Sequence, residues 1–89
     1  QEFAREVFPG RFLVEGDTGP EVTLLQTRLN QLAAQDSDIP TVTVDGVFGP
    51  ATAQAVRAVQ SRLGYSTTGA VGPVLWSYII TQGTGYGIF

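Results

Sequence analysis

The chain has 89 residues, with eight acidic and five basic side chains and a net charge of −3. This length allows one domain with a single modest core. The acidic balance argues against nucleic acid as a partner, and the absence of cysteine and histidine excludes disulfides, thiolate or imidazole metal sites and histidine-activated nucleophiles.

The sequence has no run of about 20 apolar residues, so we expect no insertion into a membrane. Because the chain begins at Gln1 and carries no signal peptide, we expect that it was cut from a longer protein. We predict that residues 1–12 are a linker or N-terminal extension, that residues 13–82 form the domain, and that residues 83–89 are a C-terminal tail.

The pattern Gly-x-x-Gly-Pro occurs three times, at residues 16–20, 46–50 and 69–73. Proline suits the first position of a helix, where its missing N–H would have no partner. Glycine lets the chain turn into that position through dihedrals that a side chain would resist. Since an apolar periodic stretch follows each copy, the pattern predicts three helix starts.

The first helix is predicted over residues 20–34, because Val22, Leu25, Leu29 and Leu32 fall on one face. Residues 35–45 are predicted to form a loop with a short extended piece at residues 41–44.

The second helix is predicted over residues 50–63, with Gly64 just after its end. A shorter third helix is predicted from residue 73 to about residue 81. Its apolar and aromatic side chains are Leu75, Trp76, Tyr78 and Ile79.

The first two helices also resemble each other, because residues 22–29 align with residues 56–63. The helices are thus 34 residues apart and the turns before them 30 apart, a difference of about one helical turn. We therefore predict an all-α fold: a compact three-helix bundle of two related turn-helix units plus a short third helix.

These motifs resemble the peptidoglycan-binding-domain-like family, small three-helix modules attached to many cell-wall hydrolases. The segment that carries the resemblance most specifically is Asp-Gly-x-Phe-Gly-Pro-x-Thr at residues 45–52. The family's Gly-Asp-x-Gly turn and its Val-x-x-Leu-Gln helix are matched by residues 16–19 and 22–26. Its Gly-Pro-x-x-Trp start is matched by residues 72–76, and the resemblance covers roughly residues 13–80.

The resemblance implies a non-catalytic module that binds peptidoglycan and targets or anchors a linked catalytic domain to the wall. It implies an extracellular or cell-wall location, and we expect a monomer with no cofactor, no metal and no catalytic residues. Two features depart from the family pattern: Val59 replaces the usual phenylalanine, and the loop at residues 35–43 is longer than the commonest form. The alternative is a structural or regulatory interdomain module, such as a spacer or pro-segment, without wall binding.

Several polar residues have both a structural and a functional interpretation. Asp45 either caps the turn before the second helix, as Asx turns do, or faces a ligand amine or hydroxyl. Gln26 and Gln60 are expected to brace neighbouring loops, with ligand contact as the alternative. Asp36 and Asp38 are interpreted as solvated loop residues and not as a metal site or glycosidase pair.

Large and charged side chains supply the remaining candidates. Phe48 is expected to fill the core, whereas Tyr65 could offer its ring to a sugar. Arg28 and Arg62 are expected to be exposed, with pairing to a stem-peptide carboxylate as the alternative. The candidate ligand-binding residues are therefore Asp45, Gly46, Phe48, Thr52, Arg28, Arg62 and Tyr65.

Helix starts expose backbone N–H groups and the positive end of the helix dipole, which favour carboxylates. The stem peptides of peptidoglycan carry carboxylates. A groove bordered by two of these turns is therefore a further hypothesis for where a stem-peptide carboxylate binds.

Overall fold

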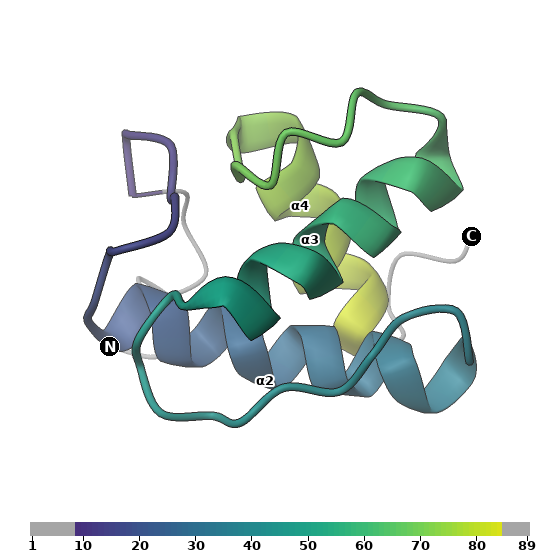
Figure 1. The fold of residues 1–89 in the computed structure, drawn as a ribbon, viewed down its shortest axis with the longest axis horizontal. Coiled ribbons are helices and arrows are strands. Elements are labelled where there is room, and N and C mark those ends of the chain that lie inside the picture. The colour runs from purple at the N-terminus through teal and green to yellow at the C-terminus, as the bar shows by residue number, and fades with distance from the viewer. Residues whose placement is uncertain (1–8, 85–89) are drawn as a thin grey trace.

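The computed structural model describes residues 9–84 of the chain, and side chains from residue 9 to residue 81. Within this range, three helices follow one another: α2 (Pro20–Gln35), α3 (Pro50–Leu63) and α4 (Pro73–Thr84). In Figure 1, α3 crosses in front of α4, and α2 runs along the lower edge of both. The predicted all-α, three-helix fold is confirmed. None of the helices in the described part is long and apolar enough to cross a membrane.

Each predicted helix start is at the expected residue. Proline occupies the beginning of α2 and of α3, and the residues before them are Gly19 and Gly49. Gly19 has a φ of 128°, which a residue with a side chain rarely adopts. Neither of these two helix starts has a side-chain hydrogen bond to cap it.

The end of α3 follows the prediction, and the end of α4 corrects it. Gly64 is left-handed with φ 78°, and it and Tyr65 donate to the carbonyls of Ser61 and Gln60, so the helix closes in a Schellman motif. The third helix continues past the predicted end near residue 81 to Thr84. One glycine inside a helix costs about 1 kcal/mol, which is too little to end a helix anchored by buried side chains.

Helices α2 and α4 pack against each other, and buried side chains of α3 and of the loops complete the core. The side chains predicted to point inward from α2 are all buried, and Val59 is buried as well. Leu63 and Tyr78 are half-buried at the edge of the core. The largest fully buried side chains are Trp76, Phe48, Leu13, Leu25, Leu29 and Ile79.

The long loop between α2 and α3 is held by α2 itself. Residues 41–44 form no strand; instead the backbone N–H and C=O of Val42 bond to the side-chain amide of Asn30, at 2.7 and 2.8 Å. Val42 and Ile39 are buried. The loop therefore takes its backbone partner from a helix side chain and needs no neighbouring strand.

The three glycine-rich turns are joined through the segment that leads into α2. Leu13 and Val71 exchange two backbone hydrogen bonds, of 3.0 and 2.9 Å. The N–H of Gly16 donates to the carbonyl of Phe48, and the N–H of Phe48 donates to the carbonyl of Asp17, both at 2.8 Å. The turns before α3 and α4 are thus both fixed to residues 13–19.

Gln26 and Gln60 brace loops, as predicted, and they do so in equivalent ways. The Oε1 atom of Gln26 accepts the N–H groups of Asp45 and Gly46, at 3.0 and 2.9 Å. Its two Nε2 protons serve three acceptors: the Asp45 carboxylate, the carbonyl of Val47 and the hydroxyl of Thr52. This side chain is 1% exposed, so its amide depends on these partners.

Gln60 repeats the arrangement one turn-helix unit later. Its Oε1 accepts the N–H of Gly69 at 2.9 Å, and its Nε2 donates to the hydroxyl of Thr68 and the carbonyl of Ala70. Gly46 and Gly69, with φ of 75° and 81°, occupy the same place in the two turns. The helix repeat seen in the sequence therefore corresponds to a repeated hydrogen-bonding pattern.

Asp36 links the ends of two helices. Its carboxylate accepts the N–H of Asp38 and forms an ion pair with Arg62 near the end of α3. The backbone N–H of Asp38 first, and then the Arg62 guanidinium, lower the pKa of this carboxyl below its usual 3.8. The ionised form of Asp36 is therefore favoured in the folded state.

We expect Gln26→Leu to lower the free energy of unfolding by about 2–4 kcal/mol, because it leaves buried backbone groups of the turn without partners. Gln60→Leu should have a smaller effect, because Gln60 makes fewer bonds. Urea unfolding measures both changes, with the exposed Gln54→Leu as the control. A Gln26→Leu protein as stable as this control would contradict the bracing role.

The melting temperature should fall as the pH is lowered below about 3.8, the ordinary pKa of aspartate. The carboxyls of Asp17, Asp36 and Asp45 all have lowered pKa values in the folded state. The unfolded chain therefore takes up protons first, and the stability present above pH 3.8 is lost in acid. Thermal melts from pH 5 to pH 2.5 measure this, and Asp36→Asn should flatten the dependence. A melting temperature that stays constant to pH 3 would refute the expectation.

Candidate functional site

A shallow depression of about 200 Å³ lies at the start of α3. It coincides with the segment at residues 45–52 that the sequence marks as most specific. Two predicted ligand residues, Asp45 and Thr52, line it together. The other lining residues are Gln26, Thr43, Val47, Gly49, Pro50 and Ala51.

Asp45 places a negative charge at the rim of this depression. Its Oδ1 accepts the N–H of Val47 at 3.0 Å, which is the predicted Asx turn, and also accepts Nε2 of Gln26. The Val47 N–H first, and then the Gln26 amide, lower the pKa of Asp45 below 3.8. Asp45 is exposed and therefore presents an ionised carboxylate to solvent at neutral pH.

The first turn of α3 places hydrogen-bond donors beside that carboxylate. Pro50 has no N–H, and the first intrahelical bond there runs from the N–H of Ala53 to the carbonyl of Gly49, at 3.0 Å. Within the described residues, the N–H groups of Ala51 and Thr52 have no hydrogen-bond acceptor. The depression therefore combines one anionic acceptor with two backbone donors at the positive end of a helix.

The structure places the other predicted candidates elsewhere. Phe48 is fully buried, so its ring fills the core and offers no surface to a ligand. Gly46 is not among the lining residues, although its N–H bonds to Gln26, which is. Tyr65 is 47% exposed, but it follows the end of α3, about 20 Å along the helix from Pro50.

The two predicted arginines do not join the depression either. Arg62 is exposed and occupied by its ion pair with Asp36. Arg28 is half-buried, which differs from the expected exposure, and its Nη1 donates to Gln31 at 3.3 Å. Since Arg28 is two residues from Gln26 on the same helix, it points to a different face of α2.

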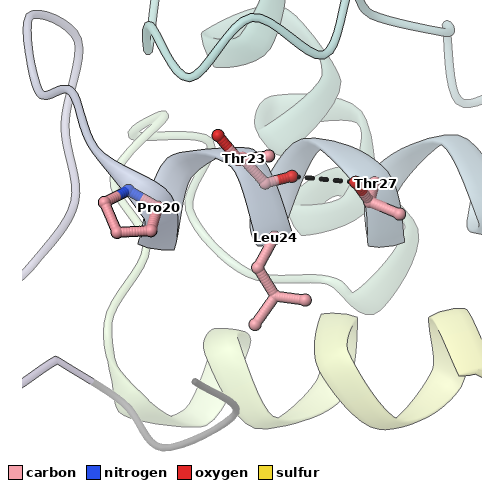
Figure 2. A pocket seen from close by; sticks show the side chains of 4 residues that line it. All are labelled: Pro20, Thr23, Leu24 and Thr27. Carbon is pink, nitrogen blue, oxygen red and sulfur yellow. Dashed lines mark hydrogen bonds between the residues drawn. The ribbon is translucent and has the colours of Figure 1, made fainter. Parts of the chain in front are cut away.

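A second depression, of about 270 Å³, lies beside the first two turns of α2 (Figure 2). Pro20, Thr23, Leu24 and Thr27 line it, and Leu24 points towards α4. The hydroxyl of Thr27 donates to the carbonyl of Thr23 at 2.9 Å, and that of Thr23 donates to the carbonyl of Gly19. Because both hydroxyl protons bond within the helix, this surface offers a polar ligand less than the depression at α3.

The depression at α3 differs in place from the groove predicted between two glycine-rich turns, which stays a prediction. The first and second turns hydrogen-bond directly to each other, and the depression lies beside the second turn, between it and Thr43. Thr43 and Val47 line the site without having been predicted. The sequence pointed to them only through their position: Val47 lies within the motif at residues 45–52, and Thr43 lies just before it.

Comparison with known proteins agrees with this fold. The family model described as "Putative peptidoglycan binding domain" matches residues 18–79. An uncharacterized protein in the bpoA1 3′ region of Kitasatospora aureofaciens is 41% identical over 76 residues. That alignment covers 81% of this chain and 60% of the relative, so the chain spans about three fifths of the relative's length.

A solved structure has a similar fold. The crystal structure of the SleB N-terminal domain superposes with a TM-score of 0.71 at 28% identity, covering 86% of this chain and 99% of that one. The helix order, the glycine-rich turns and the match over residues 18–79 lead to one conclusion. This chain belongs to the peptidoglycan binding domain family.

Proposed function

We propose that this domain is a non-catalytic module that binds peptidoglycan and holds a linked protein, such as a wall-active enzyme, at the cell wall. The observation that carries the proposal is the depression at the start of α3, built from the motif at residues 45–52. Family membership supplies the ligand class.

The groups around the depression suit peptidoglycan. Amino, amide and hydroxyl groups of the wall polymer can donate to the ionised carboxylate of Asp45. Carbonyl or carboxylate oxygens can accept from the N–H groups of Ala51 and Thr52. The hydrogen bonds of Gln26 to Asp45 and Gly46 hold this segment in place. The buried side chain of Phe48 anchors the same segment in the core.

We propose that residues 13–82 form the wall-binding unit and that it acts outside the cell or in the wall. Two residues before that boundary contact the unit: Arg11 pairs with Asp17, and the ring of Phe12 lies against Gly72. The described residues hold no group of three or more side chains suited to a metal ion. Any catalytic activity is assigned to a linked domain.

Sedimentation with purified sacculi should retain the wild-type chain well above an acidic protein of similar size. Ala51→Glu should lower retention several-fold, because a carboxylate at this exposed position in the first turn competes for the free N–H groups of α3. The same charge change in an exposed loop, Ser37→Glu, is the matched control and should bind like wild type. Equal retention of the two variants would exclude the α3 depression as the site, and no wild-type retention would refute wall binding.

The alternative is a structural or regulatory interdomain module, and one observation favours it. Phe12 and Val74 are 59% and 66% exposed, and Phe12 packs on Gly72, two residues before Val74. If this apolar surface binds a neighbouring domain, Phe12→Ser should release that domain without affecting binding to sacculi.

A further inference from the structure

Charge is distributed unevenly along the chain. All eight acidic residues lie within residues 1–45, together with three of the five arginines. Residues 46–89 carry two arginines, Arg57 and Arg62, and no acidic residue. The segment that contains α3, the loop after it and α4 is therefore the part of the chain that suits an anionic ligand group.

The two arginines of this unit differ in what they contact. Arg62 is neutralised by Asp36. Arg57 is exposed on α3, and among residues 9–84 no carboxylate lies within ion-pair distance of it. Within this part of the chain, no acidic side chain neutralises its charge.

Arg57 is held in a defined position by the turn before α4. A Cβ atom placed on Gly69 would lie 3.2 Å from each of Cζ, Nε and Nη2 of Arg57, so the flat face of the guanidinium covers this glycine. Gly69 is itself fixed, because it is buried and its N–H donates to Gln60. Stacking by the face leaves the in-plane N–H donors at the edge of the guanidinium free to bind.

The equivalent position in the first unit shows that the fold does not need this charge. Residue 23 aligns with residue 57 in the helix repeat, and the hydroxyl of Thr23 lies over Gly46 as Arg57 lies over Gly69. A small neutral side chain is therefore enough to cover the glycine of the turn. Packing over the turn therefore does not explain why residue 57 is an arginine.

Arg57 also continues the surface of the candidate site. Pro50, Gln54 and Arg57 are spaced i, i+4 and i+7, and all three are exposed on one face of α3. Two helical turns, about 10 Å, separate Pro50 at the depression from Arg57. One stem peptide can therefore reach both places.

We propose that Arg57, supported by Gly69, binds a free carboxylate of the peptidoglycan stem peptide as a bidentate pair. The inference rests on the proposed function and names the ligand group and the residue that recognises it. A planar guanidinium fork matches the two oxygens of a carboxylate, which an amide group does not. The module should therefore distinguish stem peptides with free carboxylates from amidated ones.

Calorimetric titration of the whole chain with a soluble disaccharide-tetrapeptide tests this, using the free-acid form and the same compound with its carboxylates amidated. Wild type should bind the free acid about fivefold more tightly or better. Arg57→Gln should remove that preference and weaken binding of the free acid by about five- to tenfold. Arg57→Lys, which keeps the charge but loses the fork, should fall between the two.

Arg11→Gln is the matched control, because it removes an exposed arginine charge elsewhere. Since Arg57 is exposed, Arg57→Gln should keep the wild-type melting temperature. If Arg57→Gln binds both compounds as Arg11→Gln does while wild type still binds sacculi, the inference is overturned and the proposed function stands. If wild type binds neither the compounds nor sacculi, both fail.

Discussion

The structure depends on one repeated interaction: a buried glutamine amide that satisfies the backbone of a glycine turn. A turn with a left-handed glycine directs backbone groups into the domain, where each would cost free energy without a partner. Gln26 and Gln60 supply those partners from the preceding helix. Because each turn leads straight into the next helix, one side chain fixes both a loop and a helix start.

The same interaction determines what the surface can offer. The helices begin with glycine and proline and not with a serine or aspartate cap, so the first N–H groups of α3 are not capped by a side chain. Asp45 is held by Gln26 and by the Asx turn, yet its carboxylate is still exposed. Fold and candidate site therefore share one segment: Asp45 has the structural role in the turn, and its exposed carboxylate leaves the proposed ligand role open to it.

Much of the fold could be predicted because its signals are local. Glycine-proline pairs mark helix starts, and the 3.6-residue period marks the buried faces, so the starts of all three helices were predicted correctly. The bracing roles of Gln26 and Gln60 were predicted because a buried amide needs partners. The predicted end of α4 was wrong, because tertiary packing outweighs the low helix propensity of one glycine.

The residues that line the candidate site were harder to predict than the helices, because the site depends on contacts between distant segments. Nothing local shows that Asn30 bonds to Val42, or that Arg62 is neutralised by Asp36 while Arg57 is not. Phe48 carries the motif and yet lies entirely within the core. The motifs thus marked the segment that forms the candidate site, but not which of its residues reach the surface.

The motif segment at the start of α3 is the proposed wall-binding surface. Amide chemical-shift mapping of the whole chain during titration with a soluble muropeptide tests it most directly. We expect the largest shifts at residues 45–52, extending along the exposed face of α3 to residue 57 and the turn at residue 69. Shifts confined to residues 20–27 of α2, or binding to the wall without shifts at residues 45–52, would rule this surface out.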